Sequence, residues 1–333
     1  MNTSVHKSET TRRRVLGLAA GAAVLPVMSR MTWAQSYPSR PITMIVGYAA
    51  GAATDTIGRI IADRMKSSLG QRIIVENVSG AGGTIAAGRV AHAAPDGYTL
   101  GIGNNNLYVM AGTAYALQYD LLNDFEPVAL LSTGPLVLVA RKAMPANDLR
   151  GLIAWLKANP DKATFGTGIP ATPGLLFQRE TGTRFQFVPY PRGATPIIQD
   201  LMASQIDIAI TDPIISLPQV RAGTIKGYGV TTKTRLQSAP DIPTLDEAGL
   251  PGFDVSMWYG LWLPKGTPKD IIARLNAAVT DALADPMMRA RLADLAQETF
   301  PRDQQTPEAL RALQKTEIEK WWPIIKAAGI KGE

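Results

Sequence analysis

The sequence predicts an α/β protein of two lobes, each a mostly parallel sheet flanked by helices. Short apolar runs of strand length alternate with longer segments whose apolar residues follow helical spacing, and this order implies strands covered on both faces. The 333 residues suffice for two domains at ~150 residues each. Hydrophobic residues make up 46% of the chain and charged residues 19%, so each lobe can bury a core.

The first third of the chain contains three predicted strands and two predicted helices. The strands lie at residues 42–46, 73–76 and 99–103, and the helices at 55–69 and 84–93. Apolar residues from Ile57 to Leu69 recur at helical spacing, and Gly70 then ends the first helix.

The rest of the chain repeats the alternation and closes with helices. Strands are predicted at 136–140, 164–165, 187–188, 206–210, 227–230 and 257–263, and helices at 149–158, 175–181, 194–203, 268–284, 287–295 and 307–328. Pro286 separates the first two closing helices, because proline does not fit a helix interior. A stretch rich in proline and glycine, residues 239–253, precedes the long apolar strand at 257–263.

The composition excludes several kinds of chemistry. The chain has no cysteine, which rules out thiolate catalysis, disulfides, Cys-based zinc sites and a lipid anchor on cysteine. Its histidines are His6 and His92, so a histidine-dependent enzyme would rest on His92 alone, without a visible partner. The sequence contains no G-x-S-x-G, H-E-x-x-H or G-x-x-x-x-G-K-[ST] motif. We therefore expect no metal, no cofactor and no catalysis.

The net charge of +6 gives little reason to expect a nucleic-acid partner. Five basic residues and one acidic residue lie among the first 35, so the remainder is nearly neutral. The lysines and arginines are scattered along the chain, whereas a nucleic-acid interface needs a basic patch or stripe.

The N-terminal 34 residues have the order of an export signal. Arg12 and Arg13 precede an apolar run at residues 16–28, and Thr32-Trp33-Ala34 offers small residues for cleavage. The arginine pair followed by a hydrophobic pair is typical of twin-arginine signals. The general secretory route and a basic tail beside an N-terminal helix are the alternatives. No later apolar stretch reaches the ~20 residues that span a membrane, so we expect a periplasmic protein.

Two open α/β sheets in one chain suggest a ligand crevice beyond the carboxyl ends of their strands. The loop at residues 47–55 is mostly glycine and alanine, and it leads into a helix whose free N–H groups can bind an anion. The alternative is a tight turn with Thr54 or Asp55 as the N-cap. The loop at 103–106 carries three asparagines, which can donate to a ligand or bond to their own backbone.

Three further loops carry candidate ligand contacts. Residues 166–172 formally fit a dinucleotide-binding loop, but Pro170 removes an N–H and no acid follows the next strand, so an anion-binding turn remains. Arg192 stands at a helix start, where it either pairs with a ligand anion or lies in solvent. Asp212 either caps the next helix or accepts from a ligand, and capping is the simpler reading.

A series of motifs from residue 37 to about residue 330 resembles the Bordetella uptake gene family, the substrate-binding proteins of tripartite tricarboxylate transporters. The motifs, in order, are Tyr37-Pro38-Ser39-Arg40-Pro41-Ile42, the loop ending Thr54-Asp55, Val75-Glu76-Asn77 with Gly80-Ala81-Gly82-Gly83, Ala94-Pro95-Asp96-Gly97-Tyr98-Thr99-Leu100, Asp124-Phe125-Glu126-Pro127-Val128, Ile242-Pro243-Thr244 with Glu247-Ala248-Gly249, and Trp258-Tyr259-Gly260-Leu261.

The resemblance implies a type II-like periplasmic binding fold whose two lobes are joined by crossing strands. It implies capture of a carboxylate, partly through ordered water, and delivery to membrane permease subunits. We accordingly expect lobe 1 at residues 37–135 and 259–333 and lobe 2 at residues 136–258, after an export signal at residues 1–34. By position, loops 48–55 and 166–172 look like the carboxylate clamp, and residues 190–194 and Asp212 look like cleft residues.

The residues predicted to contact the ligand come from the five loops above. They are Tyr48, Ala49, Gly51, Ala52, Ala53, Thr54, Asp55, Asn104, Asn105, Thr167, Gly168, Ala171, Thr172, Tyr190, Arg192, Gly193, Ala194 and Asp212. The chain departs from the family at Gly51-Ala52-Ala53, where three glycines are common, at residues 169–174, where a polar run is usual, and at Arg192, where lysine is common. These departures predict a more apolar wall and an aromatic or aliphatic dicarboxylate as ligand.

The leading hypothesis is a monomeric, non-enzymatic solute-binding protein of the periplasm that serves a tripartite tricarboxylate-type transporter. Two alternatives remain at this stage. One is an exported α/β enzyme that acts on a small carboxylate, and the other is a partner that presents its ligand to a membrane sensor.

Overall fold

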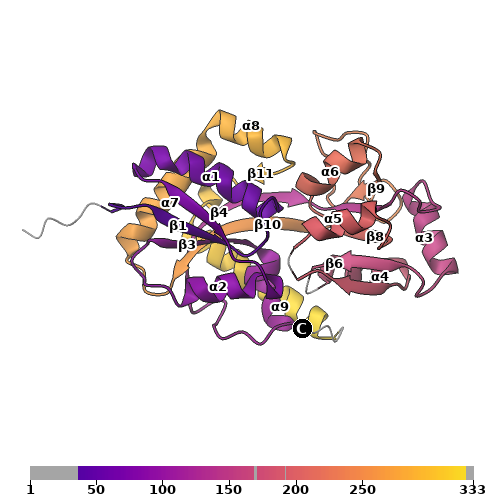
Figure 1. The fold of residues 1–333 in the computed structure, drawn as a ribbon, viewed down its shortest axis with the longest axis horizontal. Helices are drawn as coiled ribbons and strands as arrows, with labels where there is room; N and C mark the ends of the chain where they lie inside the picture. Colours follow the sequence, from indigo (N-terminus) through magenta and orange to yellow (C-terminus); the bar gives the residue numbers. More distant parts are fainter. Residues whose placement is uncertain (1–36, 169–170, 192, 328–333) are drawn as a thin grey trace, which may run out of the picture. The chain divides into compact units, whose positions relative to one another are not determined.

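The computed structural model describes residues 37–168, 171–191 and 193–327, and within them the chain builds two sheets (Figure 1). The first sheet has six strands in the order β11-β4-β10-β3-β1-β2. Its strands are β1 Ile42–Val46, β2 Ile73–Asn77, β3 Thr99–Asn104, β4 Phe125–Pro135, β10 Ser256–Pro264 and β11 Glu298–Thr299.

The second sheet has five strands in the order β7-β6-β8-β5-β9. Its strands are β5 Val137–Arg141, β6 Thr164–Thr167, β7 Gln186–Pro189, β8 Ile208–Thr211 and β9 Ile225–Val230. We call the first sheet with its helices lobe 1 and the second sheet with its helices lobe 2.

Both sheets are mixed, which corrects the expectation of mostly parallel sheets. β1 pairs in parallel with β2 and β3, and β6 pairs in parallel with β7 and β8. The strands that connect the lobes run against their neighbours: β10 is antiparallel to β3 and β4, and β5 is antiparallel to β8 and β9. A chain that leaves a lobe on one strand and returns on the adjacent strand must reverse its direction, so the crossing strands cannot be parallel.

Helices cover both sheets as the alternation predicts. Lobe 1 carries α1 Ala53–Leu69, α2 Thr84–Ala91, α7 Lys269–Ala284, α8 Pro286–Asp294 and α9 Pro307–Ala327. Lobe 2 carries α3 Leu149–Ala158, α4 Thr172–Thr181, α5 Thr195–Met202 and α6 Pro213–Arg221. None of the helices in the described part of the chain has the length and apolar character needed to cross a membrane.

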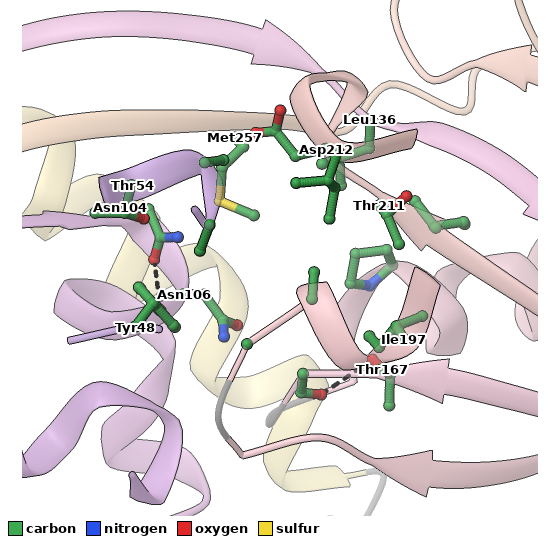
Figure 2. A pocket seen from close by; sticks show the side chains of 18 of the residues that line it. Tyr48, Thr54, Asn104, Asn106, Leu136, Thr167, Ile197, Thr211, Asp212 and Met257 are labelled. Atoms are coloured by element: carbon green, nitrogen blue, oxygen red, sulfur yellow. Dashed lines mark hydrogen bonds between the residues drawn. The ribbon is translucent and has the colours of Figure 1, made fainter. Parts of the chain in front are cut away.

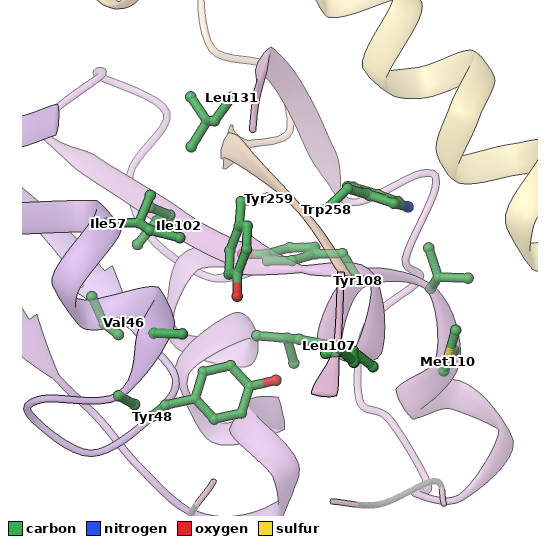
Figure 3. Packing of buried hydrophobic residues seen from close by; sticks show 14 of the residues in the cluster. Val46, Tyr48, Ile57, Ile102, Leu107, Tyr108, Met110, Leu131, Trp258 and Tyr259 are labelled. Carbon is green, nitrogen blue, oxygen red and sulfur yellow. The ribbon is translucent and has the colours of Figure 1, made fainter. Parts of the chain in front are cut away.

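The core of lobe 1 is centred on β10 and the aromatic residues beside it (Figure 3). Tyr108 stacks on Trp262 with ring centroids 3.7 Å apart, and Phe125 meets Tyr108 edge-on at 5.3 Å. Trp258, Trp262 and Trp321 are buried, and the indole of Trp322 donates to the carbonyl of Val109. These tryptophans pack within the protein and do not form an exposed stacking platform.

Candidate ligand-binding site

A cavity of about 110 Å³ lies among the loops that follow strands of both sheets (Figure 2). It can hold roughly seven to eleven water-sized groups, at ~10–15 Å³ for each. Residues of both lobes line it, namely Tyr48, Ala52, Ala53, Thr54, Asn104, Asn106, Leu136, Thr167, Gly168, Pro173, Gly193, Ala194, Ile197, Ile210, Thr211, Asp212, Ile215, Met257 and Tyr259. The cavity therefore suits a solute of a few carbon atoms.

The start of α1 forms one wall of the cavity. Ala52 is the N-cap residue and has no side-chain capping bond, so Thr54 and Asp55 lie inside the helix and neither is its cap. Ala52, Ala53 and Thr54 all line the cavity. Because the first N–H groups of a helix have no partner within it, this wall presents backbone donors and the positive end of a 17-residue helix.

Asp55 braces this loop from behind. Its carboxylate accepts from the Gly51 N–H at 2.8 Å, from Asn77 Nδ2 at 2.9 Å and from Arg59 Nε at 3.0 Å, and the residue is only 2% exposed. Burial alone would raise the pKa of Asp55, but the bonds from Arg59, Gly51 and Asn77 together lower it. Asp55 thus fixes the shape of the loop, and neither Asp55 nor Gly51 lines the cavity.

The asparagine loop after β3 supplies the next group. Asn104 Oδ1 accepts from the Tyr48 hydroxyl at 3.0 Å and from the Leu107 N–H at 3.1 Å, which holds both side chains in place. Asn104 and Asn106 line the cavity, whereas Asn105 donates to the carbonyl of Ser256 and does not line it. Burial raises the pKa of Tyr48, so its hydroxyl remains protonated and keeps its bond to Asn104.

Two loops of lobe 2 contribute residues to the cavity. Thr167, the last residue of β6, and Gly168 after it line the cavity, and so do Gly193 and Ala194 before α5. Gly193 packs closely on Tyr48 of lobe 1, because a Cβ added at Gly193 would lie 3.2 Å from Tyr48 Cδ1.

Several predicted contacts lie away from the cavity or outside the described residues. The predicted residues that do not line it are Ala49, Gly51, Asp55, Asn105, Ala171, Thr172 and Tyr190. Thr172 instead donates to the sulfur of Met110 at 3.3 Å, and the Tyr190 hydroxyl donates to Asp200. Arg192 lies outside the described residues, as do residues 169 and 170 of the loop at 166–172 and the predicted export signal at residues 1–34.

Asp212 caps the next helix, which was one of its two predicted roles, and it also lines the cavity. Its Oδ1 caps α6 by accepting from the Ile214 N–H at 2.9 Å, and its Oδ2 accepts from the Tyr259 hydroxyl at 2.6 Å. Asp212 also lines the cavity, although it is only 6% exposed. Burial raises the pKa of Asp212 to about 6, against the opposing effect of its two hydrogen bonds.

Four helices begin at the cavity, and α1 offers the most backbone donors. Residues at or next to the starts of α1, α4, α5 and α6 line it. The last three carry Pro173, Pro196 and Pro213 in their first turns, and proline has no N–H. The arrangement is suited to holding an anion against α1. The described residues contain no cluster of acidic, histidine or cysteine side chains that could hold a metal.

The predicted contacts omit lining residues near the starts of helical segments, at the end of β8 and along the chain that connects the lobes. These are Asn106, Leu136, Pro173, Ile197, Ile210, Thr211, Ile215, Met257 and Tyr259. Most are apolar or stand inside predicted elements, so their sequence context indicated a core position. The one available signal was adjacency in the sequence. Asn106 follows the predicted contact Asn105, and Thr211 precedes the predicted contact Asp212.

The fold and the cleft define a two-lobed solute-binding protein. Residues 57–330 match the Tripartite tricarboxylate transporter family receptor, and the chain belongs to this family. It is therefore a periplasmic solute receptor and not an enzyme, in agreement with the resemblance drawn from the sequence motifs.

Solved structures of similar proteins agree with this assignment. The periplasmic binding protein BugD is 34% identical, with a TM-score of 0.83 over 89% of this chain and 99% of BugD. MatC from Rhodopseudomonas palustris, solved with bound malate, is 38% identical, with a TM-score of 0.81 over 87% of this chain and 100% of MatC. A third protein, from R. palustris and solved with adipate, is 30% identical, with a TM-score of 0.83 over 89% and 99% of the two chains.

Proposed function

We propose that this protein captures a small carboxylate in the cavity between its lobes and delivers it to the permease subunits of a tripartite tricarboxylate-type transporter. The observation that carries the proposal is the start of α1, where Ala53 and Thr54 line the cavity at the positive end of the helix. A carboxylate at this position accepts the N–H bonds that the helix itself leaves unused. Tyr48 and Asn106 supply side-chain polar groups beside it.

The size and the apolar wall of the cavity support a small organic acid. The apolar side chains of the cavity lining favour a hydrocarbon segment in the ligand. They are Leu136, Ile197, Ile210, Ile215 and Met257. Similar proteins have been solved with malate and with adipate, and both acids have small aliphatic skeletons. An aliphatic dicarboxylate or an aromatic acid of similar size fits this lining.

Export precedes binding in this proposal. Arg12 and Arg13 ahead of the apolar run at residues 16–28 direct the precursor to the twin-arginine route, and residues 1–34 are removed. The mature chain then acts as a monomer that shuttles between solute and permease. Family membership supports the transporter partner, because the family consists of receptors for this class of transporter.

Calorimetry on the mature protein tests the proposal. Succinate, malate and adipate are each titrated beside their diamides, which keep the shape and lose the charge. We expect at least one acid to bind about a hundredfold more tightly than its diamide, since charge-assisted bonds contribute ~1.5–3 kcal/mol each. The bound acid should be recovered unchanged by mass spectrometry. Equal affinity for acid and diamide, or conversion of the acid, would contradict the proposal.

A further inference from the structure

The cavity has a second group of polar atoms, separate from the start of α1. Figure 2 shows Thr54, Asn104, Asn106 and Tyr48 toward one side of the cavity and Thr211 and Asp212 toward the other. Tyr259 of β10 joins the second group, because its hydroxyl donates to Asp212 Oδ2 at 2.6 Å. Thr211 is the last residue of β8 and Asp212 follows it directly, so a sheet of lobe 2 fixes their position.

Asp212 can accept more hydrogen bonds than the protein provides. Each carboxylate oxygen has about two acceptor positions. Oδ1 has the Ile214 N–H at 2.9 Å and Oδ2 has the Tyr259 hydroxyl, and both of these donors are uncharged. Among the described residues that line the cavity, Asp212 is the only acid, and none is a lysine, arginine or histidine. This side of the cavity is thus a hydrogen-bond acceptor.

Thr211 has a polar atom that the protein leaves without a partner. Its Oγ1 is buried, makes no hydrogen bond within the protein, and belongs to a residue that is 3% exposed and lines the cavity. A buried hydroxyl without a partner destabilises the folded protein. Thr211 precedes Asp212 directly in the sequence, so its hydroxyl is a candidate second partner for a group bound at Asp212.

We propose that Thr211, Asp212 and Tyr259 form a subsite for a hydrogen-bond donor of the ligand, so that the solute is a carboxylate carrying a hydroxyl or ammonium group. The ligand carboxylate lies against α1, and its donor group bonds to Asp212 while Thr211 completes the contact. This inference rests on the proposed function, since it assigns the second half of the same site.

The alternative occupant, a second carboxylate without a donor, is disfavoured at this position. Two carboxylates in contact repel each other unless one takes up a proton. Tyr259 cannot relieve this repulsion, because its hydroxyl already donates its proton to Asp212 Oδ2 and loss of that proton would add a further negative charge. The subsite therefore discriminates between acids of equal size by the presence of one donor group.

Calorimetry at neutral pH with three acids of the same carbon skeleton tests this subsite. Succinate has no donor, malate adds a hydroxyl, and aspartate adds an ammonium group at the same carbon. We expect malate or aspartate to bind about tenfold to a hundredfold more tightly than succinate, as one hydrogen bond to a charged group provides. The order of malate and aspartate identifies which donor the subsite takes.

Two substitutions in the subsite and one control locate the discrimination. In Asp212→Asn the cap of α6 is kept, because asparagine is also a good N-cap, while the charge is lost. In this variant we expect the affinity for the donor-bearing acid to lie within about threefold of the affinity for succinate. Succinate itself should bind as tightly as to the wild type or more tightly. Thr211→Val should weaken binding of the donor-bearing acid and leave succinate unchanged. Asp207→Asn is the control, because Asp207 stands at the opposite end of β8 and bonds to Arg141 and Thr164.

The outcomes separate this inference from the proposed function. Equal binding of all three acids, or a preference that survives Asp212→Asn, overturns the donor subsite but leaves carboxylate capture intact. If Asp207→Asn also loses the preference for the donor-bearing acid, the loss in Asp212→Asn reflects general stability, and the subsite is overturned. Absence of binding by the three acids and by adipate overturns the subsite and the proposed function together.

Discussion

The N–H of Gly82 donates a hydrogen bond of 3.0 Å to the carbonyl oxygen of Pro191. Gly82 belongs to a short 3₁₀ turn of lobe 1, Ala81–Gly83, and Pro191 follows β7 of lobe 2. The packing of Gly193 on Tyr48 joins the same two lobes beside the cavity. The lobes are therefore in direct contact, as expected of a binding protein in its closed form.

Gly82→Ala should weaken this closure. Gly82 has a φ of 64°, and an added Cβ would lie 2.9 Å from Tyr115 Cε2, so the turn must shift and the bond to Pro191 is strained. If the weakened hydrogen bond makes the contact between the lobes less stable by about 1 kcal/mol, ligand affinity falls by about fivefold. Gly70→Ala is the matched control, because Gly70 has a φ of 70° at the end of α1 with open space around its Cβ. Equal affinities of the two variants by calorimetry would argue against the contact as a closure element.

Asp55→Ala should destabilise the protein without touching the cavity directly. The substitution leaves the Gly51 N–H and the Asn77 amide without their acceptor beside the helix start. We expect the free energy of unfolding to fall by about 2–4 kcal/mol in urea titrations. Arg59→Ala should cost about 1 kcal/mol or less, because the Arg59 side chain is half exposed. If both variants lost a similar free energy of unfolding, Asp55 would stabilise the protein through its ion pair with Arg59 and not through the loop.

The stability of the empty protein should depend on pH through Asp212. Its pKa is raised from 3.8 to about 6 by burial, so the folded state binds a proton more strongly than the unfolded chain does. Stability from this group therefore increases as the pH falls from about 7 to about 4, by up to about 3 kcal/mol. Urea unfolding of the wild type and Asp212→Asn at about pH 7.5 and pH 5 measures the difference. A constant difference between the two proteins would show that Asp212 keeps an ordinary pKa.

Replacing Arg12 and Arg13 together by lysine should leave the precursor in the cytoplasm. The twin-arginine receptor recognises the arginine pair itself, so a change that keeps the charge still removes the signal. Cell fractionation with an antibody to the mature chain measures the distribution. Arg14→Lys serves as the control, since it keeps the pair. Normal periplasmic accumulation of the double variant would indicate the general secretory route.

Much of the fold could be predicted from periodicity, and the exceptions have identifiable causes. α3 has the predicted bounds of residues 149–158, and β10 extends the predicted strand by one residue at each end. β4 was missed because Pro127, Gly134 and Pro135 interrupt an otherwise apolar run and indicate turns. The mixed pairing was missed because strand direction depends on how the chain crosses between lobes, which hydrophobic spacing does not encode.

The site could be predicted as a set of loops but not as a set of contacts. Parallel strands bring their carboxyl ends to one edge, and this rule located Tyr48, Asn104, Thr167 and Asp212 near one another. Asp55 stands in the same loop, but its carboxylate turns to Asn77 and Arg59, which reach it from another strand and from the next helical turn. Such partners depend on tertiary packing and are not visible in the loop sequence.

The alternation of side chains along β10 has a consequence for how such receptors diversify. Met257 lines the cavity and is only partly buried, whereas Trp258 and Trp262 belong to the buried cluster of lobe 1. Because successive residues of a strand point to opposite faces, a residue on one face can change while those on the other face are retained. Ligand preference can therefore evolve at position 257 with little disturbance of the aromatic packing behind it. A single strand thus separates the part of the protein that is free to vary from the part that must be kept.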